Sequence, residues 1–278
     1  MNAEALPYTL YIILLELAVG GLWITLYADL RGYGVTRGFV MTMAFIVAIA
    51  AGLTWLTGAG ITIGEDIDGY PIDDGWFTPT QNAMVAVAAA AVAYTFGVFM
   101  GWDPIGRIAG IAGSAAGLFA VGALAAMLAP PTWGYAGAFI ALFAGTLAMG
   151  SVSTAMTWGH WYLTEGSLPH RPMRDLARVF FGSIALQMVV LIINAAAPER
   201  ITPVPSNPIE VGLLTNPAFF FRVGVGIVFA FVLAIMAIRT ARIGSMQSTT
   251  GLLYIAMGAV FTGEVLAKGL QFLTAKPV

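Results

Sequence analysis

The sequence predicts an all-α membrane protein with about eight transmembrane helices and both chain termini outside. Two observations carry this fold class. Hydrophobic residues make up 59% of the 278 residues and charged residues only 9%, which is far from the composition of water-soluble domains. The apolar residues also fall into runs of roughly 20, the length that an α-helix needs to cross a bilayer core. We therefore expect one integral membrane domain over residues 1–278, located in the cell inner (cytoplasmic) membrane.

The first half of the chain contains four of these runs. The first, 6–27, is long enough to span and follows no basic segment, so we interpret it as a helix rather than a signal peptide. The second and third, 39–58 and 82–101, are separated by a connection rich in glycine and proline at 59–81. The fourth, 107–129, is dominated by small residues, which favour close helix packing over lipid contact.

The second half also contains four runs, at 134–158, 175–197, 218–239 and 250–273. The connection at 198–217 contains five prolines, which resist regular structure and favour stiff, extended segments. We expect the two long connections to lie on the outer face. There they cap a cavity, dock a partner, or simply join the helices.

The connections alternate in charge along the chain. The long outer connections are acidic or neutral, whereas the others are basic. The basic residues in or beside the short connections are Arg31, Arg37, Arg107, His170, Arg171, Arg174, Arg178, Arg239 and Arg242. Because cytoplasmic connections carry an excess of lysine and arginine, this pattern places the basic connections inside and both termini outside.

A short repeat suggests how the helices are grouped. Ala18-Val19-Gly20-Gly21 in the first span resembles Ala148-Met149-Gly150-Ser151 in the fifth, and a basic connection follows each span. Both spans start outside, so the repeat would be parallel. It predicts two four-helix bundles formed by residues 1–130 and 131–278.

Composition excludes several functions. The chain has no cysteine, so thiolate chemistry and iron–sulfur ligation are absent. Its two histidines are too close in sequence for an obvious pair of haem ligands on two helices. No basic face is present for nucleic acid, so neither a haem, an iron–sulfur cluster nor a nucleic-acid partner is expected.

Polar groups interrupt three spans at a similar depth. Glu16, Gln187 and Glu264 each lie about ten residues, or roughly 15 Å, from the outer end of their span. Such groups are costly within a bilayer and are usually paired or functional. Further candidates lie nearby or closer to the outer surface: Tyr11, Asn194, Arg222 and Lys268.

Three interpretations of these residues stay open. Glu264 and Lys268 are four residues apart, so they can form a structural salt bridge on one helix face. Lys268 can instead extend to the outer interface. The third interpretation is a polar pocket that binds a quinone head group and exchanges its protons.

A histidine and several aromatic residues mark the inner end of the fifth span. His160 lies within Trp158-Gly159-His160-Trp161-Tyr162, which is typical of an interfacial aromatic belt. The connection that follows carries His170, Arg171 and Arg174. We regard these four polar residues as candidates for contact with a soluble partner.

The first and last spans resemble those of a known family. Leu14-Leu15-Glu16-Leu17-Ala18-Val19-Gly20-Gly21-Leu22 is similar to the glycine-rich first helix of the NrfD/DmsC-like membrane anchors of polysulfide and DMSO reductases. Gly263-Glu264-Val265-Leu266-Ala267-Lys268 resembles their terminal helix, and the topology of eight spans also matches. The segment 157–178 does not match the family pattern.

The resemblance implies a haem-free anchor subunit of a respiratory oxidoreductase. Such a subunit would contact lipids and iron–sulfur, molybdenum or cytochrome subunits, and would exchange electrons with menaquinone or ubiquinone. Glu16, Glu264 and Lys268 carry over only as polar-site residues. The alternatives are a proton-coupled transporter or channel for small solutes and a structural assembly subunit of a membrane complex.

Overall fold

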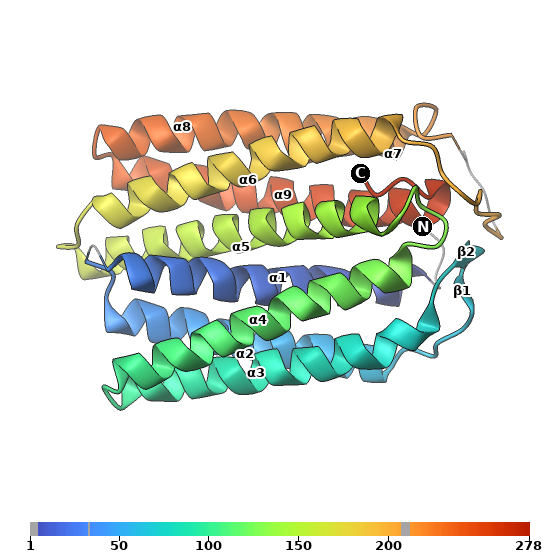
Figure 1. Cartoon of the computed structure of the whole chain (residues 1–278). Coiled ribbons are helices and arrows are strands. Elements are labelled where there is room, and N and C mark those ends of the chain that lie inside the picture. Colours follow the sequence, from blue (N-terminus) through green and yellow to red (C-terminus); the bar gives the residue numbers. More distant parts are fainter. Residues whose placement is uncertain (1–4, 33, 207–211) are drawn as a thin grey trace.

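The protein is a multi-pass membrane protein built almost entirely from helices. The computed structural model describes residues 5–32, 34–206 and 212–278, and this part contains eight helical spans long and apolar enough to cross a membrane. They lie side by side along one direction (Figure 1). The spans are α1 (Ala5–Arg31), α2 (Arg37–Ala59), α3 (Phe77–Phe99), α4 (Asp103–Leu128), α5 (Tyr135–Glu165), α6 (Arg171–Ala196), a seventh span of three segments, and α9 (Met246–Thr274).

The seventh span changes its helical winding along its length. It consists of α7 (Pro217–Phe221), a π-helical segment η2 (Arg222–Phe229) and α8 (Ala230–Arg242). A π-helix is wider than an α-helix and often accompanies a functional site. Here it begins at a buried arginine, Arg222.

The predicted spans are confirmed, but several helices begin earlier or end later. Helix α5 continues to Glu165, so His160 lies inside the helix rather than at its end. Helix α6 begins at Arg171, which places Arg171 and Arg174 in its first turn instead of in a connection. Polar helix ends project beyond the apolar runs from which the spans were predicted.

The eight spans form two four-helix bundles. In the first, α1 and α3 each pack against α2 and α4. In the second, α5 packs against α6 and α9, and the seventh span completes the ring. The bundles meet mainly through α1 and α5, where Gly20 and Gly150 face each other: a Cβ at position 150 would lie 2.1 Å from the backbone carbon of Gly20. Helices α1–α4 thus form one bundle, and α5, α6, the seventh span and α9 form the other.

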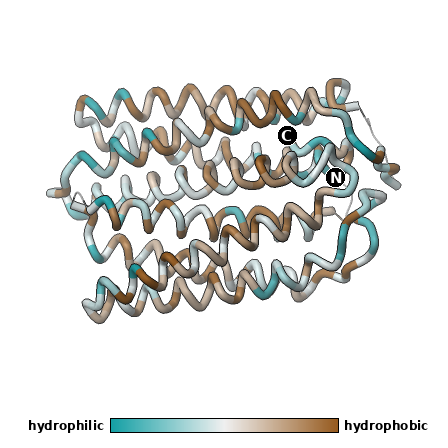
Figure 2. The backbone as a smooth tube through the Cα atoms, in the orientation of Figure 1, coloured by the Kyte–Doolittle hydropathy of each residue, from teal (hydrophilic) through white to brown (hydrophobic). Residues whose placement is uncertain are grey.

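The outside of the bundles is apolar. Phe45, Phe96, Ile108 and Ile192 remain largely exposed there, as expected for side chains that contact lipid. Hydrophilic residues gather in the connections at both ends (Figure 2). This distribution matches a protein whose solvent is a bilayer along its sides and water at its ends.

One end carries both long connections, and we call it the hairpin end. Strands β1 (Asp66–Ile67) and β2 (Tyr70–Pro71) pair there, and a short 3₁₀ helix η1 (Asp74–Trp76) leads into α3. Asp68 and Gly69 both have positive φ, at 53° and 79°, the conformation that a two-residue hairpin turn requires. The beginning of α1 and the C-terminal end of the chain lie at this end as well (Figure 1).

The two long connections pack on each other instead of remaining independent. Ser206 donates to Asp68 Oδ1 through its backbone N–H and its hydroxyl, at 3.1 and 2.6 Å. The hydroxyl of Tyr70 is fully buried and donates to the carbonyl of Leu128 at 2.5 Å. Together these contacts form a folded cap at the hairpin end.

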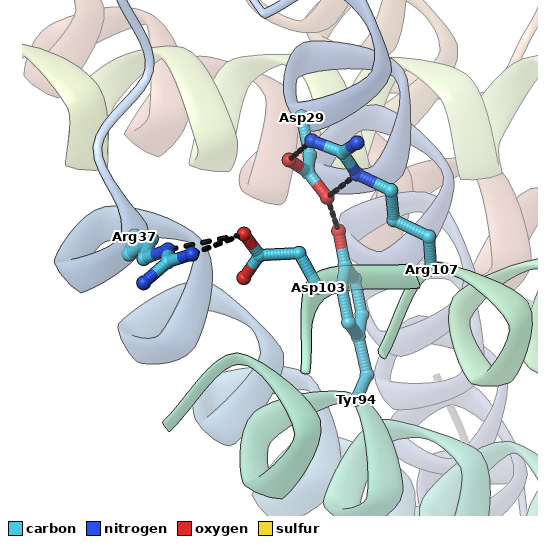
Figure 3. A network of polar contacts seen from close by, with 5 residues as sticks. All are labelled: Asp29, Arg37, Tyr94, Asp103 and Arg107. Carbon is cyan, nitrogen blue, oxygen red and sulfur yellow. Dashed lines mark hydrogen bonds and ion pairs between the residues drawn. The ribbon is translucent and has the colours of Figure 1, made fainter. Parts of the chain in front are cut away.

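The opposite end, which we call the arginine end, is held by ion pairs. Arg107 on α4 binds Asp29 on α1 with two hydrogen bonds of 2.9 and 3.1 Å, and Tyr94 on α3 donates to the same carboxylate at 2.7 Å (Figure 3). Arg37 pairs with Asp103 at 2.5 Å beside it. These contacts fix α1 to α4 within the first bundle.

Candidate functional site

The polar residues from different spans meet inside the protein. Glu16 from α1, Gln187 from α6, Arg222 from η2, and Glu264 and Lys268 from α9 form one group, which we call the buried cluster. None of the five is more than 3% exposed. Their side chains therefore interact with one another in place of water.

Lys268 links the two carboxylates of the buried cluster. Its Nζ lies 2.6 Å from Glu16 Oε1 and 3.1 Å from Glu264 Oε2. Glu264 Oε1 accepts a hydrogen bond from Gln187 Nε2 and lies 3.3 Å from Arg222 Nη1. Glu264 thus contacts three groups from three spans, whereas Glu16 has Lys268 as its charged partner.

The formal charges of the buried cluster cancel. Glu16 and Glu264 carry two negative charges, and Arg222 and Lys268 carry two positive ones. Pairing of this kind offsets the large cost of removing charges from water. Removing a single member would leave an uncompensated charge in the protein interior.

Helix α5 contributes space rather than a polar group. A Cβ at Gly145 would lie 2.6 Å from Glu16 Oε1 and 2.9 Å from Glu264 Oε2. The two carboxylates therefore lie directly against the backbone of α5. Gly145 has no charge and lies on a fifth span, so the pattern of polar residues in the sequence does not indicate it.

A second pair of glycines brings η2 close to α9. A Cβ at Gly226 would lie 2.6 Å from Gly263 Cα, and one at Gly263 would lie 2.9 Å from Arg222 Nη1. Arg222 consequently reaches Glu264 across a very narrow contact between the two helices. The sequence does hold a signal for this contact, since Gly263 precedes Glu264 and Gly226 lies one helical turn after Arg222.

A small cavity borders the buried cluster on the side of the hairpin end. Its volume, measured as space open to the centre of a water molecule, is about 10 Å³. That is room for about one water. Among the described residues, Gln187 Oε1 and Arg222 Nε have no hydrogen-bond partner, and both residues line this cavity.

Two predicted site residues lie outside the buried cluster. Asn194 accepts from Trp133 Nε1 at 2.7 Å and donates to the carbonyls of Gly137 and Pro277 at 3.2 and 2.6 Å. It therefore joins α5, α6 and the C-terminal residues instead of the charged groups. Tyr11 is fully buried and packs on Phe77, with ring centroids 5.6 Å apart.

Lys268 does not extend to the interface. That interpretation is wrong, because its ammonium group turns inward to both carboxylates and the residue is only 3% exposed. The attraction of two carboxylates outweighs the hydration that the outer interface would provide.

The candidates for partner contact lie together at the arginine end. His160 is exposed, and its Nδ1 lies 3.3 Å from the hydroxyl of Tyr254 on α9. His170 packs edge-on against Tyr162, with ring centroids 5.7 Å apart. Arg171 is exposed and Arg174 is half-buried. Contact of these residues with a partner stays a prediction.

Within the described residues, histidine, aspartate and glutamate do not gather in groups of three that could hold a metal ion. Comparison with known protein families, with characterised proteins and with solved structures found no match to this chain. The buried cluster and its surroundings are therefore the basis on which a function can be argued.

Proposed function

We propose that this protein is the membrane subunit of a respiratory oxidoreductase complex and that its buried cluster handles protons. The observation that carries the proton role is Lys268, whose ammonium group bridges two carboxylates from different spans. Ionisable groups at this depth commonly form proton relays. The respiratory setting rests on the resemblance of the first and last spans to reductase anchor subunits.

The geometry suggests how a proton would be held. In the described state, Lys268 divides its contacts between Glu16 and Glu264. A proton that reaches Glu16 neutralises it, and Lys268 then pairs with Glu264 alone. Loss of the proton restores both contacts. Glu264 keeps Gln187 and Arg222 as partners throughout, which makes Glu16 the member that can change its charge at the smaller cost.

In the described state, we place protons rather than a quinone ring beside these side chains. The cavity at the buried cluster has room for about one water. A quinone head group is several times larger, so we assign no quinone contact to the cluster. In this proposal the cluster supplies protons, and electron transfer belongs to partner subunits.

The structural alternative is favoured by one observation, the balance of two negative and two positive charges. A balanced group could act only as a lock between spans. The transporter alternative expects matched helix breaks in the two halves. The seventh span contains the π-helical η2, whereas its counterpart α3 is a continuous α-helix, so these two spans give no such match.

Glu16→Gln tests the proton role, because the amide keeps the shape of the side chain but cannot titrate. Infrared difference spectra of the purified protein after a pH step should contain a carboxylic-acid band in the wild type that is lost in Glu16→Gln. Turnover of the complex in native membranes should fall by about a hundredfold to ten-thousandfold, the usual range for loss of a proton-transfer group.

Asp29→Asn is the matched control, since it also removes a carboxylate that is paired with a cation, but at the arginine end. It should keep both the infrared band and the turnover. A structural lock predicts a different pattern: Glu16→Gln would lower the yield or thermal stability and leave the spectrum and the turnover per assembled complex unchanged.

A further inference from the structure

The last four residues of the chain fold back into the protein. Helix α9 ends at Thr274, and Ala275 adopts a left-handed conformation with φ of 55°. This turn directs residues 275–278 towards the interior of the second bundle, where Ala275 is 1% and Val278 is 6% exposed. Val278 packs there with Leu191, Phe219 and Leu270.

These residues close the cavity beside the buried cluster. Pro277 and Val278 line it on one side, and Gln187, Arg222, Glu264 and Lys268 line it on the other. The cavity offers both a donor and an acceptor, because Arg222 Nε and Gln187 Oε1 have no partner among the described residues. One water bound to both would be satisfied, which matches the available volume.

Polar contacts at the hairpin end hold the folded-back residues in place. Lys276 Nζ lies 3.1 Å from Glu199 Oε2 and donates to the carbonyl of Ala197. Asn194 Nδ2 donates to the carbonyl of Pro277 at 2.6 Å. The ion pair is partly exposed, with 37% of the Glu199 side chain accessible, so water competes with it.

A polar route continues from the cavity towards the hairpin end. Gln271 lines the cavity, lies three residues after Lys268, and donates to the hydroxyl of Tyr70 at 3.2 Å. Tyr70 belongs to the cap formed by the long connections. The cavity thus lies between the buried cluster and this end of the protein, and Gln271 links it to Tyr70.

We propose that residues 275–278 are a plug over a binding site for a single water molecule, and that release of the plug opens the buried cluster to the hairpin end. The bound water accepts from Arg222 and donates to Gln187. The assignment of this opening to proton entry rests on the proton role proposed above. Whether residues 275–278 control access to the cavity can be tested without measuring proton transfer.

The absence of cysteine makes access measurable with single thiols. Ala144 lines the cavity from α5, and Ala148 lies one turn further along the same helix, equally buried but away from the cavity lining. Ala144→Cys and Ala148→Cys would each be made alone and in combination with Lys276→Gln. This substitution removes the cation of the ion pair between Lys276 and Glu199, which we call the latch. A small cationic methanethiosulfonate reagent then reports the labelling rate of the purified protein.

We expect Lys276→Gln to raise the labelling rate at position 144 by about tenfold, which corresponds to a shift of about 1.4 kcal/mol in the opening equilibrium. The rate at position 148 should not change. Glu199→Gln removes the ion pair but leaves the hydrogen bond from Lys276 to the carbonyl of Ala197. It should therefore raise the rate at position 144 by up to about fivefold, equivalent to less than about 1 kcal/mol, and serves as the second variant if Lys276→Gln folds poorly. An unchanged rate at position 144 in both variants, or an equal rise at both positions, would overturn the plug.

The two proposals fail in distinguishable ways. Labelling reports access and does not depend on any proton transfer. If Glu16→Gln keeps its infrared band while position 144 still responds to Lys276→Gln, the plug stands and the proton role fails. If the band behaves as expected but position 144 does not respond, the plug fails alone.

Discussion

Gly145 is the residue that most sharply limits the buried cluster. An added Cβ would lie 2.6 Å from Glu16 Oε1 and 2.9 Å from Glu264 Oε2, so Gly145→Ala forces both carboxylates to shift from α5 and disturbs their contacts with Lys268. We expect a loss of about 1–3 kcal/mol in the free energy of unfolding, the usual cost of overpacking. Thermal unfolding of the purified protein in detergent measures the change.

The control for Gly145→Ala is Gly182→Ala on α6. A Cβ at position 182 meets no atom within 4 Å, and alanine favours a helix over glycine by roughly 0.5–1 kcal/mol. Gly182→Ala should therefore leave stability unchanged or raise it slightly. Equal melting temperatures for the two variants would mean that the carboxylates move freely and do not depend on the backbone of α5.

The residues that sequence analysis located were those whose chemistry is costly in a bilayer. Glu16, Gln187 and Glu264 stand out in apolar runs, and their equal depth predicted that they meet. Gly145 could not be located, because its importance comes only from the side chains that another helix places against it. The sequence places Asn194 and Lys268 at a similar depth, but Asn194 hydrogen-bonds to Trp133 and to backbone carbonyls instead of joining the buried cluster. Which of these partners a polar side chain meets depends on how the neighbouring elements pack.

Among the elements, the latch at the C-terminal end depends on pH. A backbone hydrogen bond, followed by the Lys276 ammonium group, lowers the pKa of Glu199 below its ordinary value of 4.5. A lowered pKa in the folded protein means that the pair stabilises the fold above pH 4.5 and that this contribution is lost as the pH falls through the lower value.

Wild type and Glu199→Gln should therefore differ in melting temperature near neutral pH and converge in acid. The difference should correspond to less than about 1 kcal/mol, because the pair is partly exposed. Thermal unfolding measured over a pH series tests this. A difference that persists at pH values where Glu199 is protonated would show that the substitution acts through packing and not through the ion pair.

The helices themselves were easier to predict than their ends or their connections. Apolar runs identify the part of a helix inside the bilayer, but α5 and α6 continue into water with polar residues such as Glu165 and Arg171. The connection at 59–81 was predicted only as a segment rich in glycine and proline, and it contains a hairpin because Asp68-Gly69 accepts positive φ. The π-helical winding of η2 has no counterpart in the apolar pattern, and it occurs where η2 packs closely against α9.

At the scale of the whole molecule, the two bundles are alike in arrangement but not in chemistry. Gly20 and Gly150 meet at the contact between α1 and α5, and the two short repeats lie on either side of it. The same alignment pairs Glu16 with Thr146, whose hydroxyl is satisfied by the carbonyl of Leu142 at 2.7 Å. The buried charges therefore do not follow the repeat: α1 supplies Glu16, and the second bundle supplies Arg222, Glu264 and Lys268.

The orientation of the whole protein in the membrane can be tested by labelling its two ends. The structure places the hairpin end and the arginine end at opposite ends of the spans, and the positive-inside rule assigns the arginine end to the cytoplasm. Asp73 and Ser206 are exposed at the hairpin end, and Arg171 is exposed at the arginine end. Single cysteines at positions 73 and 206 should react with a membrane-impermeant thiol reagent in intact cells, whereas one at position 171 should react only after the membrane is opened. Labelling at position 171 alone in intact cells would reverse the orientation and move the plug and its opening to the cytoplasmic side.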